Sequence, residues 1–187
     1  MKKAFKIVTI TLLILILCRG FIFRSTTYYT DIGDRKAIKI THPELIKIID
    51  KASENKNINI HTITEIADNI TTKNLQFTSG KASNNPNKLI NTKQANCVGY
   101  AAMFNAISNH LIEQNGLQNE IKANHKIGKL DFLGVDLHQF FDSPFFRDHD
   151  FNELSNNITK EKIIIDSSVS DYLWIDRVNK RKWSNEV

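Results

Sequence analysis

The chain has 187 residues and a formal net charge of +5 at pH 7, and hydrophobic residues make up 41% of it. That length is enough for one domain with an ordinary hydrophobic core. The first 24 residues include five basic and no acidic residues, and the remainder holds 20 of each. The net charge therefore belongs to the N-terminus, and it gives no reason to expect nucleic-acid binding.

The N-terminus has the pattern of a secretory signal. Residues 7–18 form an unbroken run of apolar residues and threonine, and lysines precede it. The run is short for a membrane span, which needs about 20 residues. Phe21–Phe23 extend it beyond Arg19 and Gly20. We predict a signal peptide or membrane anchor over residues 1–24, with cleavage left open. If the anchor is retained, residues 7–23 contact the membrane. Either form places the domain outside the cytoplasm, in the periplasm or another extracytoplasmic space.

The next segments are predicted from their composition. Residues 25–40 are polar and aromatic, and we expect a tether or a short extended segment there. Pro43 fits the first turn of a helix that runs to about residue 52. Thr62 and Glu65 resemble a capping box at the start of a second amphipathic helix. We therefore assign residues 41–187 to a single domain.

Cys97 is the only cysteine outside the N-terminal segment, so the exported domain has no intrachain disulfide. Residues 76–95 are polar and predict a long loop that leads to it. Asn96 is suited to cap a helix whose apolar residues recur at helical spacing, and Gly116 is suited to end it. Cys97 then falls in the first helical turn, where unpaired amides and the helix dipole favour the reactive thiolate.

A hairpin is predicted near the C-terminal end. Alternating residues predict strands at 121–127 and 130–135, separated by a turn at Gly128, and the hairpin strands follow at 146–154 and 161–167. A turn centred between residues 157 and 158 places His149 directly opposite Asp166, and Glu153 opposite Lys162. Directly opposed side chains have Cβ atoms about 5 Å apart, which suits a carboxylate that orients an imidazole.

The ordered trio Cys97, His149 and Asp166 resembles the catalytic residues of the transglutaminase-like cysteine peptidase superfamily. The histidine motif His149-Asp150-Phe151-Asn152-Glu153-Leu154 is similar to the superfamily pattern His-x-aromatic-x-Glu-apolar, and the likeness covers roughly residues 60–170. The chain departs from the pattern at three places: Ala95 replaces a frequent Gly, Phe151 a frequent Trp, and Ser167 a frequent Pro.

The resemblance implies an α+β fold with a papain-like core, in which N-terminal helices and the nucleophile helix pack on a small antiparallel sheet. It also implies thiol-dependent acyl transfer, most simply peptidase or amidase hydrolysis of a peptide or protein substrate without cofactor or metal. Gln94 is a candidate oxyanion donor because it lies three residues before Cys97. A catalytically inactive binding module on the same fold and a crosslinking transglutaminase remain alternatives.

Overall fold

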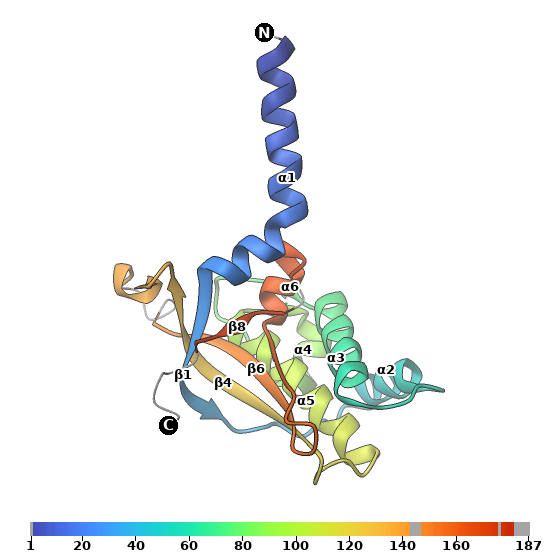
Figure 1. Ribbon diagram of the computed structural model, residues 1–187. Helices are drawn as coiled ribbons and strands as arrows, with labels where there is room; N and C mark the ends of the chain where they lie inside the picture. The colour runs from blue at the N-terminus through green and yellow to red at the C-terminus, as the bar shows by residue number, and fades with distance from the viewer. Residues whose placement is uncertain (1, 143–146, 176, 182–187) are drawn as a thin grey trace.

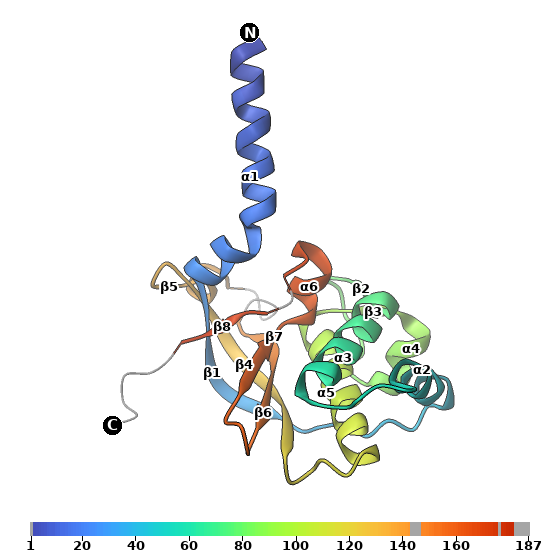
Figure 2. The same ribbon diagram turned by 45° about the vertical axis from the view of Figure 1, so that its right-hand side comes forward.

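The computed structural model describes residues 2–142, 147–175 and 177–181. The protein is a mixed α+β molecule in which most helices lie on one side of a sheet (Figures 1 and 2). The helices are α1 (Lys2–Thr26), α2 (Pro43–Ser53), α3 (Ile60–Asn74), α4 (Pro86–Thr92), α5 (Cys97–Gln114), η1 (Leu137–Phe140) and α6 (Ser167–Leu173). The strands are β1 (Thr27–Arg35), β2 (Gln76–Phe77), β3 (Gln94–Ala95), β4 (Ile121–Phe132), β5 (Val135–Asp136), β6 (His149–Asn156), β7 (Lys162–Ile165) and β8 (Asn179–Lys180).

The main sheet has the strand order β7-β6-β4-β1-β8, and β5 pairs with the end of β4. Its neighbours are antiparallel except for β1 and β8, which run parallel, so the expectation of a purely antiparallel sheet is wrong at that edge. The central strands are β6, β4 and β1. Segments far apart in the chain, including one next to the N-terminal helix, therefore meet in a single sheet.

Of the two expectations for residues 25–40, a tether or a short extended segment, the extended segment is found over residues 27–35, which form β1. β1 pairs with β4 along its length, and Tyr29 within it is fully buried. Its place in the main sheet was not predicted, because its other side chains are mostly polar. Among them, Asp31 contacts lysines from neighbouring strands.

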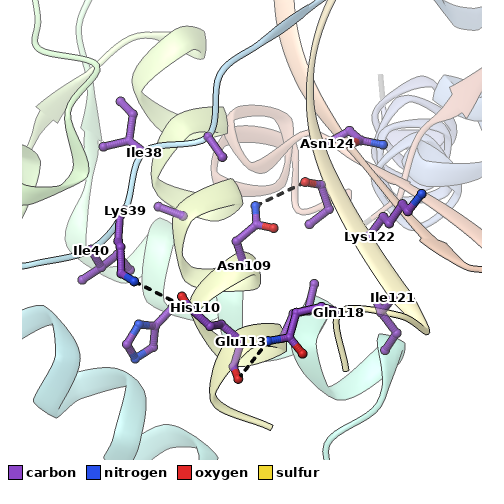
Figure 3. Close-up of a pocket in the computed structure, with 14 residues that line it drawn as sticks. Ile38, Lys39, Ile40, Asn109, His110, Glu113, Gln118, Ile121, Lys122 and Asn124 are labelled. Atoms are coloured by element: carbon purple, nitrogen blue, oxygen red, sulfur yellow. Dashed lines mark hydrogen bonds and ion pairs between the residues drawn. The ribbon is translucent and has the colours of Figure 1, made fainter. Parts of the chain in front are cut away.

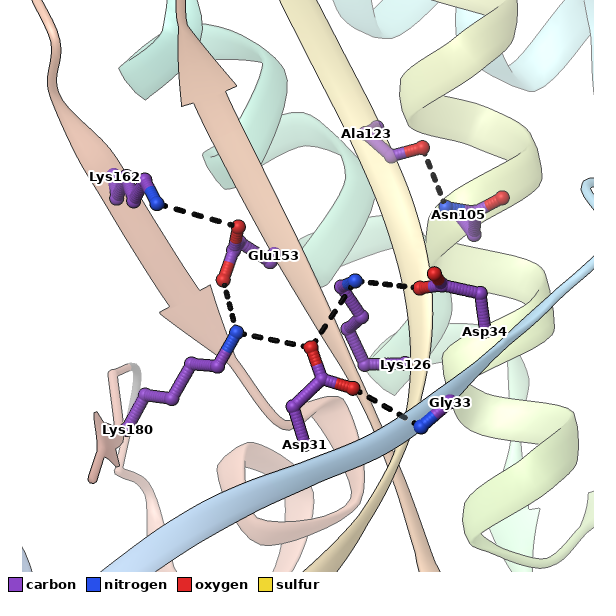
Figure 4. Close-up of polar contacts among 9 residues, drawn as sticks. All are labelled: Asp31, Gly33, Asp34, Asn105, Ala123, Lys126, Glu153, Lys162 and Lys180. Carbon is purple, nitrogen blue, oxygen red and sulfur yellow. Dashed lines mark hydrogen bonds and ion pairs between the residues drawn. The ribbon is translucent and has the colours of Figure 1, made fainter. Parts of the chain in front are cut away.

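Those contacts belong to a row of charges across the sheet (Figure 4). Glu153 of β6 lies between Lys162 at 4.0 Å and Lys180 at 2.9 Å. Lys180 also contacts Asp31 at 3.0 Å, and Lys126 of β4 contacts Asp31 at 3.1 Å. Opposite charges thus alternate over the strands, which stabilises their order without apolar cover.

The strand β4 is continuous, and the turn predicted at Gly128 is wrong. The glycine is required by packing: a Cβ atom there would lie 2.5 Å from Cε1 of Phe151 and 2.8 Å from the carbonyl oxygen of Thr30. Close approach of a ring and a neighbouring backbone is a usual reason for glycine within a strand. The phenyl ring of Phe151 consequently lies directly against the sheet, beside His149.

Two apolar clusters lie on the two faces of the sheet. The larger one fills the space between the sheet and helices α2 to α5, and most of α5 is buried within it. The smaller one contains Tyr29, Phe151 and Val178, with Phe23 of α1 packed against it. Since successive residues of a strand point to opposite faces, Phe151 and Leu154 of β6 belong to different clusters.

Two local predictions about the helices need correction. The cap of α3 is Asn59, whose side chain accepts from the backbone of His61 and Thr62, so the predicted capping box at Thr62 is wrong. The predicted loop at residues 76–95 is also wrong in part, because it contains α4 and the short parallel pair β2 and β3. Asn85 caps α4 ahead of Pro86. That pair was a recognisable helix start.

Helix α1 projects from the domain as a long rod (Figure 1). Its segment Phe5–Thr26 spans 22 residues and is exposed, and by length and composition it is apolar enough to cross a membrane. This helix is compatible with a signal sequence or a membrane anchor.

Candidate active site

Cys97 is the first residue of α5, as the sequence predicted. The side chain of Asn96 caps this helix by accepting from the backbone N–H of Gly99 at 3.2 Å. Gly99 allows close packing at this point, since a Cβ atom there would lie 2.8 Å from Cβ of Ala95 and 3.1 Å from the carbonyl oxygen of Ser83. The start of the helix is therefore held firmly, and Cys97 is 8% exposed.

His149 begins β6 and contacts both other members of the predicted trio. Its Nε2 atom lies 2.6 Å from Oδ2 of Asp166. Burial lowers the pKa of His149, but the charge and hydrogen bond of Asp166, together with hydrogen bonding and charge from Cys97, raise it well above its usual value. The surroundings of His149 therefore favour its protonated form, and its side chain is 17% exposed. Because Nε2 donates to Asp166, Nδ1 is the ring nitrogen left for the thiol.

The register that predicted this contact is wrong, although the contact exists. The ladder pairs Asn152 with Ile165 and Ser155 with Lys162, two residues away from the predicted alignment. Asp166 lies just beyond the last pair and caps helix α6. A shift of two residues keeps every side chain on its own face, whereas a shift of one would have turned His149 away.

Asp166 is held in a dense hydrogen-bond network and is 1% exposed. Its Oδ1 atom accepts from the backbone N–H and the hydroxyl of Ser168, at 3.0 and 2.6 Å, and its Oδ2 atom accepts from the hydroxyl of Tyr29 at 2.7 Å. Burial raises the pKa of Asp166, but the charge and hydrogen bond of His149 and the hydroxyl donors outweigh it, so the net shift is downward. The carboxylate stays ionised and fixed.

Tyr29 and Ser168 were missed from the sequence. Tyr29 is packed edge-on to His149, with ring centroids 5.8 Å apart, and edge-on to Phe151 at 5.2 Å. Burial and the neighbouring Asp166 raise its pKa well above the usual value, so its hydroxyl remains a donor. No local pattern marks Tyr29, because β1 joins the sheet from far away in sequence. Ser168 had a signal: an Asp two residues earlier at a helix start.

A second aspartate–histidine pair lies next to the first. Asp150, the neighbour of His149, accepts from Nε2 of His125 at 2.6 Å and forms a bidentate ion pair with Arg35. Burial raises the pKa of Asp150, but the hydrogen bonds and charges of His125 and Arg35 lower it overall. The pKa of Arg35 is raised mainly by its hydrogen bond with Asp150, and the charge of Cys97 is a smaller contributor.

The position of Gln94 gives its oxyanion role no additional support. Gln94 lies in β3 with an exposed side chain, and its amide donates to Oε1 of Gln76 at 3.3 Å. That role stays a prediction.

A pocket of about 450 Å³ lies elsewhere in the molecule (Figure 3). It is lined by residues 37–40, the second half of α5 and the start of β4. Ala106 is the first α5 residue in its wall, nine residues after Cys97 and therefore about 14 Å along the helix. Lys39 and Glu113, both in its lining, form an ion pair at 3.2 Å. This pocket is separate from the Cys97 site.

No family model, curated protein or solved structure matches this chain. Among the described residues, no group of three or more His, Cys, Asp or Glu side chains is arranged to hold a metal ion.

Proposed function

We propose that the protein is a thiol-dependent acyl-transfer enzyme with a Cys97–His149–Asp166 triad on a papain-like, transglutaminase-like core. The observation that carries the proposal is the position of His149, which interacts with Cys97 and lies 2.6 Å from Asp166. A nucleophile, a base and an orienting carboxylate are the elements of nucleophilic catalysis at an acyl group.

The proposed reaction has two halves. The Cys97 thiolate attacks the substrate carbonyl carbon, and the tetrahedral intermediate collapses as His149 gives its proton to the leaving amine, leaving a thioester. Water then attacks the thioester while His149 takes its proton, and the C–S bond breaks to release the acid. Asp166 orients the ring and stabilises its charge throughout. With water as acceptor, the enzyme is a peptidase or amidase acting on a peptide or protein.

We also propose that the enzyme is exported or anchored to the membrane. Helix α1 is a signal or anchor segment, and the domain works outside the cytoplasm. Since Cys97 is the one cysteine beyond residue 18, the domain depends on a free thiol there. A reactive thiol is a functional reason for an unpaired cysteine in that setting.

The test is the rate of alkylation of Cys97 by iodoacetamide as a function of pH, in a Cys18→Ser background. Cys97 should react at mildly acidic pH, where a free cysteine with a pKa of about 8.5 is almost wholly protonated. His149→Ala should abolish that acidic reactivity. His110→Ala, a substitution in the helix that carries Cys97, is the matched control and should leave the acidic reactivity unchanged.

A parent profile that follows an ordinary thiol titration, unaffected by His149→Ala, would refute the triad and favour a binding module. Hydrolysis and amine transfer are distinguished by supplying a primary amine during turnover of a peptide substrate. We expect free acid as the main product, whereas an amide product would favour crosslinking.

A further inference from the structure

The junction between α1 and the domain is rigid. Helix α1 ends at Thr26 and strand β1 begins at Thr27, with no linker between them. The backbone N–H of Leu133 donates to the carbonyl of Thr26 at 2.8 Å, and the side chain of Asn179 donates to the carbonyl of Arg24 at 2.7 Å. The direction of the helix therefore fixes which end of the domain faces any membrane that contains it.

The apolar part of α1 is too short to cross a bilayer by itself. The run between Lys6 and Arg19 has 12 residues, or about 18 Å of helix, against a hydrocarbon thickness of about 30 Å. A spanning helix needs the whole Phe5–Thr26 segment. Arg19 then lies at or within the edge of the hydrocarbon layer, where a lone guanidinium is costly.

The domain supplies the partners that Arg19 needs. The guanidinium donates to the carbonyls of Leu173 and Trp174, at 2.6 and 3.2 Å, and lies 5.5 Å from the centroid of the Trp174 ring. It also donates to the carbonyl of Ile16 in its own helix at 2.9 Å. Leu173 and Trp174, which accept from Arg19, lie beside it at the end of α6. If α1 spans the membrane, the end of α6 therefore lies at the same depth as Arg19, at the edge of the lipid.

The surface around the base of α1 is apolar and aromatic. The end of α6 and the β4–β5 turn lie on either side of the base of α1 (Figures 1 and 2), and both carry exposed apolar side chains. We call them the α1-base patch: Phe132, Leu133, Val135, Tyr172, Leu173 and Trp174. Aromatic side chains of this kind concentrate where a membrane protein meets the headgroup layer, and exposed apolar patches mark interaction sites.

The two most exposed members of the patch are kept in a strained backbone conformation. Trp174 is 72% exposed at φ 51°, and Leu133 is 67% exposed at φ 52°. The left-handed region is unfavourable for an ordinary residue and is normally occupied by glycine or asparagine. Both backbone positions suit glycine or asparagine better, and Trp174 caps α6 through its backbone, so the local fold does not require these large apolar side chains.

We infer that the α1-base patch is inserted into the headgroup region of the bilayer, so that the domain is seated on the membrane rather than merely tethered to it. This inference rests on the proposed role of α1 as an anchor. It goes beyond that role, because an anchor alone would leave the domain free of lipid.

The test is depth-dependent fluorescence quenching of the full-length protein in phosphatidylcholine–phosphatidylglycerol vesicles that carry brominated acyl chains. Three single-tryptophan proteins are compared. The first keeps Trp174 and carries Trp183→Phe. The other two carry Trp174→Phe and Trp183→Phe, with either Leu15→Trp in α1 or Ile158→Trp in the β6–β7 turn.

Seating predicts that bromines near the glycerol quench Trp174 most strongly, that deep bromines quench Leu15→Trp most strongly, and that neither quenches Ile158→Trp. If Leu15→Trp is quenched but Trp174 behaves like Ile158→Trp, the anchor stands and seating is overturned. Seating also fails if Trp174 emission is blue-shifted but unquenched, because a protein surface or a second copy then covers it. If none of the three tryptophans is quenched, the proposed membrane anchor is overturned as well. None of these outcomes changes the alkylation test of Cys97.

A second variant separates the patch from folding. Leu133→Asn suits the left-handed conformation better than leucine does, so the domain should unfold no more easily than the parent. Seating predicts that Trp174 quenching nevertheless decreases in this variant. Unchanged quenching would remove the β4–β5 turn from the membrane contact.

Discussion

Two aspartate–histidine pairs start from neighbouring residues of β6, His149 and Asp150, whose side chains point to opposite faces of the sheet. The distance between the histidine nitrogen and the carboxylate oxygen is the same in both pairs. His149 with Asp166 and His125 with Asp150 are both joined by Nε2 and Oδ2 at 2.6 Å. They differ in the third partner. The first pair meets a thiol and is partly open to solvent, while the second is sealed and meets the guanidinium of Arg35. An acid–imidazole pair is therefore no catalytic site by itself, and the thiol beside the first pair is what supports the chemistry proposed for it.

The largest effect is expected from replacing Asp166, the carboxylate of the first pair. Asp166→Asn should lower turnover on the order of 10³- to 10⁴-fold, because a neutral amide neither stabilises the imidazolium nor fixes its tautomer. Alkylation of Cys97 should change less than turnover, since the ring moves no proton to a leaving group in that reaction. Steady-state kinetics and alkylation rates on one preparation check this. Equal losses in both would mean that Asp166 serves only the thiolate.

The second pair should respond in stability rather than in chemistry. Asp150→Ala leaves His125 and Arg35 without their shared carboxylate, and breaking a buried pair costs about 3–5 kcal/mol. Urea denaturation measures this loss in the free energy of unfolding. The control is Asp34→Ala, which removes an exposed partner of Lys126 and should cost less than about 1 kcal/mol. A variant of ordinary stability but without activity would move Asp150 into the catalytic machinery.

Replacing Tyr29 should affect both the stability of the fold and the reactivity of Cys97. Tyr29→Phe removes one hydrogen bond from a buried carboxylate, which should cost about 1.5–3 kcal/mol of unfolding free energy. Asp166 then holds the imidazolium less well, so reactivity of Cys97 at acidic pH should fall relative to the parent. Tyr28→Phe, one residue earlier in the same strand, is the control and should change neither quantity. Reactivity that survives while stability falls would make Tyr29 a packing residue only.

The smallest effect is a pH dependence of stability. Because the pKa of His149 is raised in the folded state, its protonated form stabilises the protein fully below the unfolded pKa of about 6.5, and that contribution is lost as pH rises through the folded pKa. The difference in unfolding free energy between the parent and His149→Gln should therefore be largest in mildly acidic solution and should narrow at alkaline pH. In an Asp166→Asn background the pH dependence should be weaker. A difference independent of pH would show that the two residues are not electrostatically coupled.

The parts of the fold that depend on local chemistry were predictable. Asn96 and Gly116 marked α5, and the start of that helix placed Cys97 correctly. The hairpin register was missed by two residues because the turn is centred between residues 158 and 159, one residue later than predicted. Asn156 closes this loop to Glu161 and accepts from the backbone of Ile158 and Thr159. Side-chain hydrogen bonds of this kind are set by the folded loop, not by its composition.

Non-local pairing explains the larger omission. Strand β1 is made by its neighbours β4 and β8, which lie about 100 and 150 residues later in the chain. Its charged residues find partners only after the sheet has formed, so in the sequence they resemble a solvated tether. Tyr29 was lost for the same reason, and with it the donor that completes the environment of Asp166.

Helix α6 sets the distance between the carboxylate of the proposed triad and the contact with Arg19 of α1. Asp166 caps its first turn, and Leu173 and Trp174 hold Arg19 of α1 at the other end. Seven residues of helix measure about 10 Å. If lipid covers Trp174 and Cys97 acts as proposed, the scissile bond would lie within about one such length of the headgroups. A substrate would then be selected by how far its scissile bond stands from the bilayer as well as by its side chains, and a chain fixed to the same membrane would meet that condition more readily than one diffusing in solution.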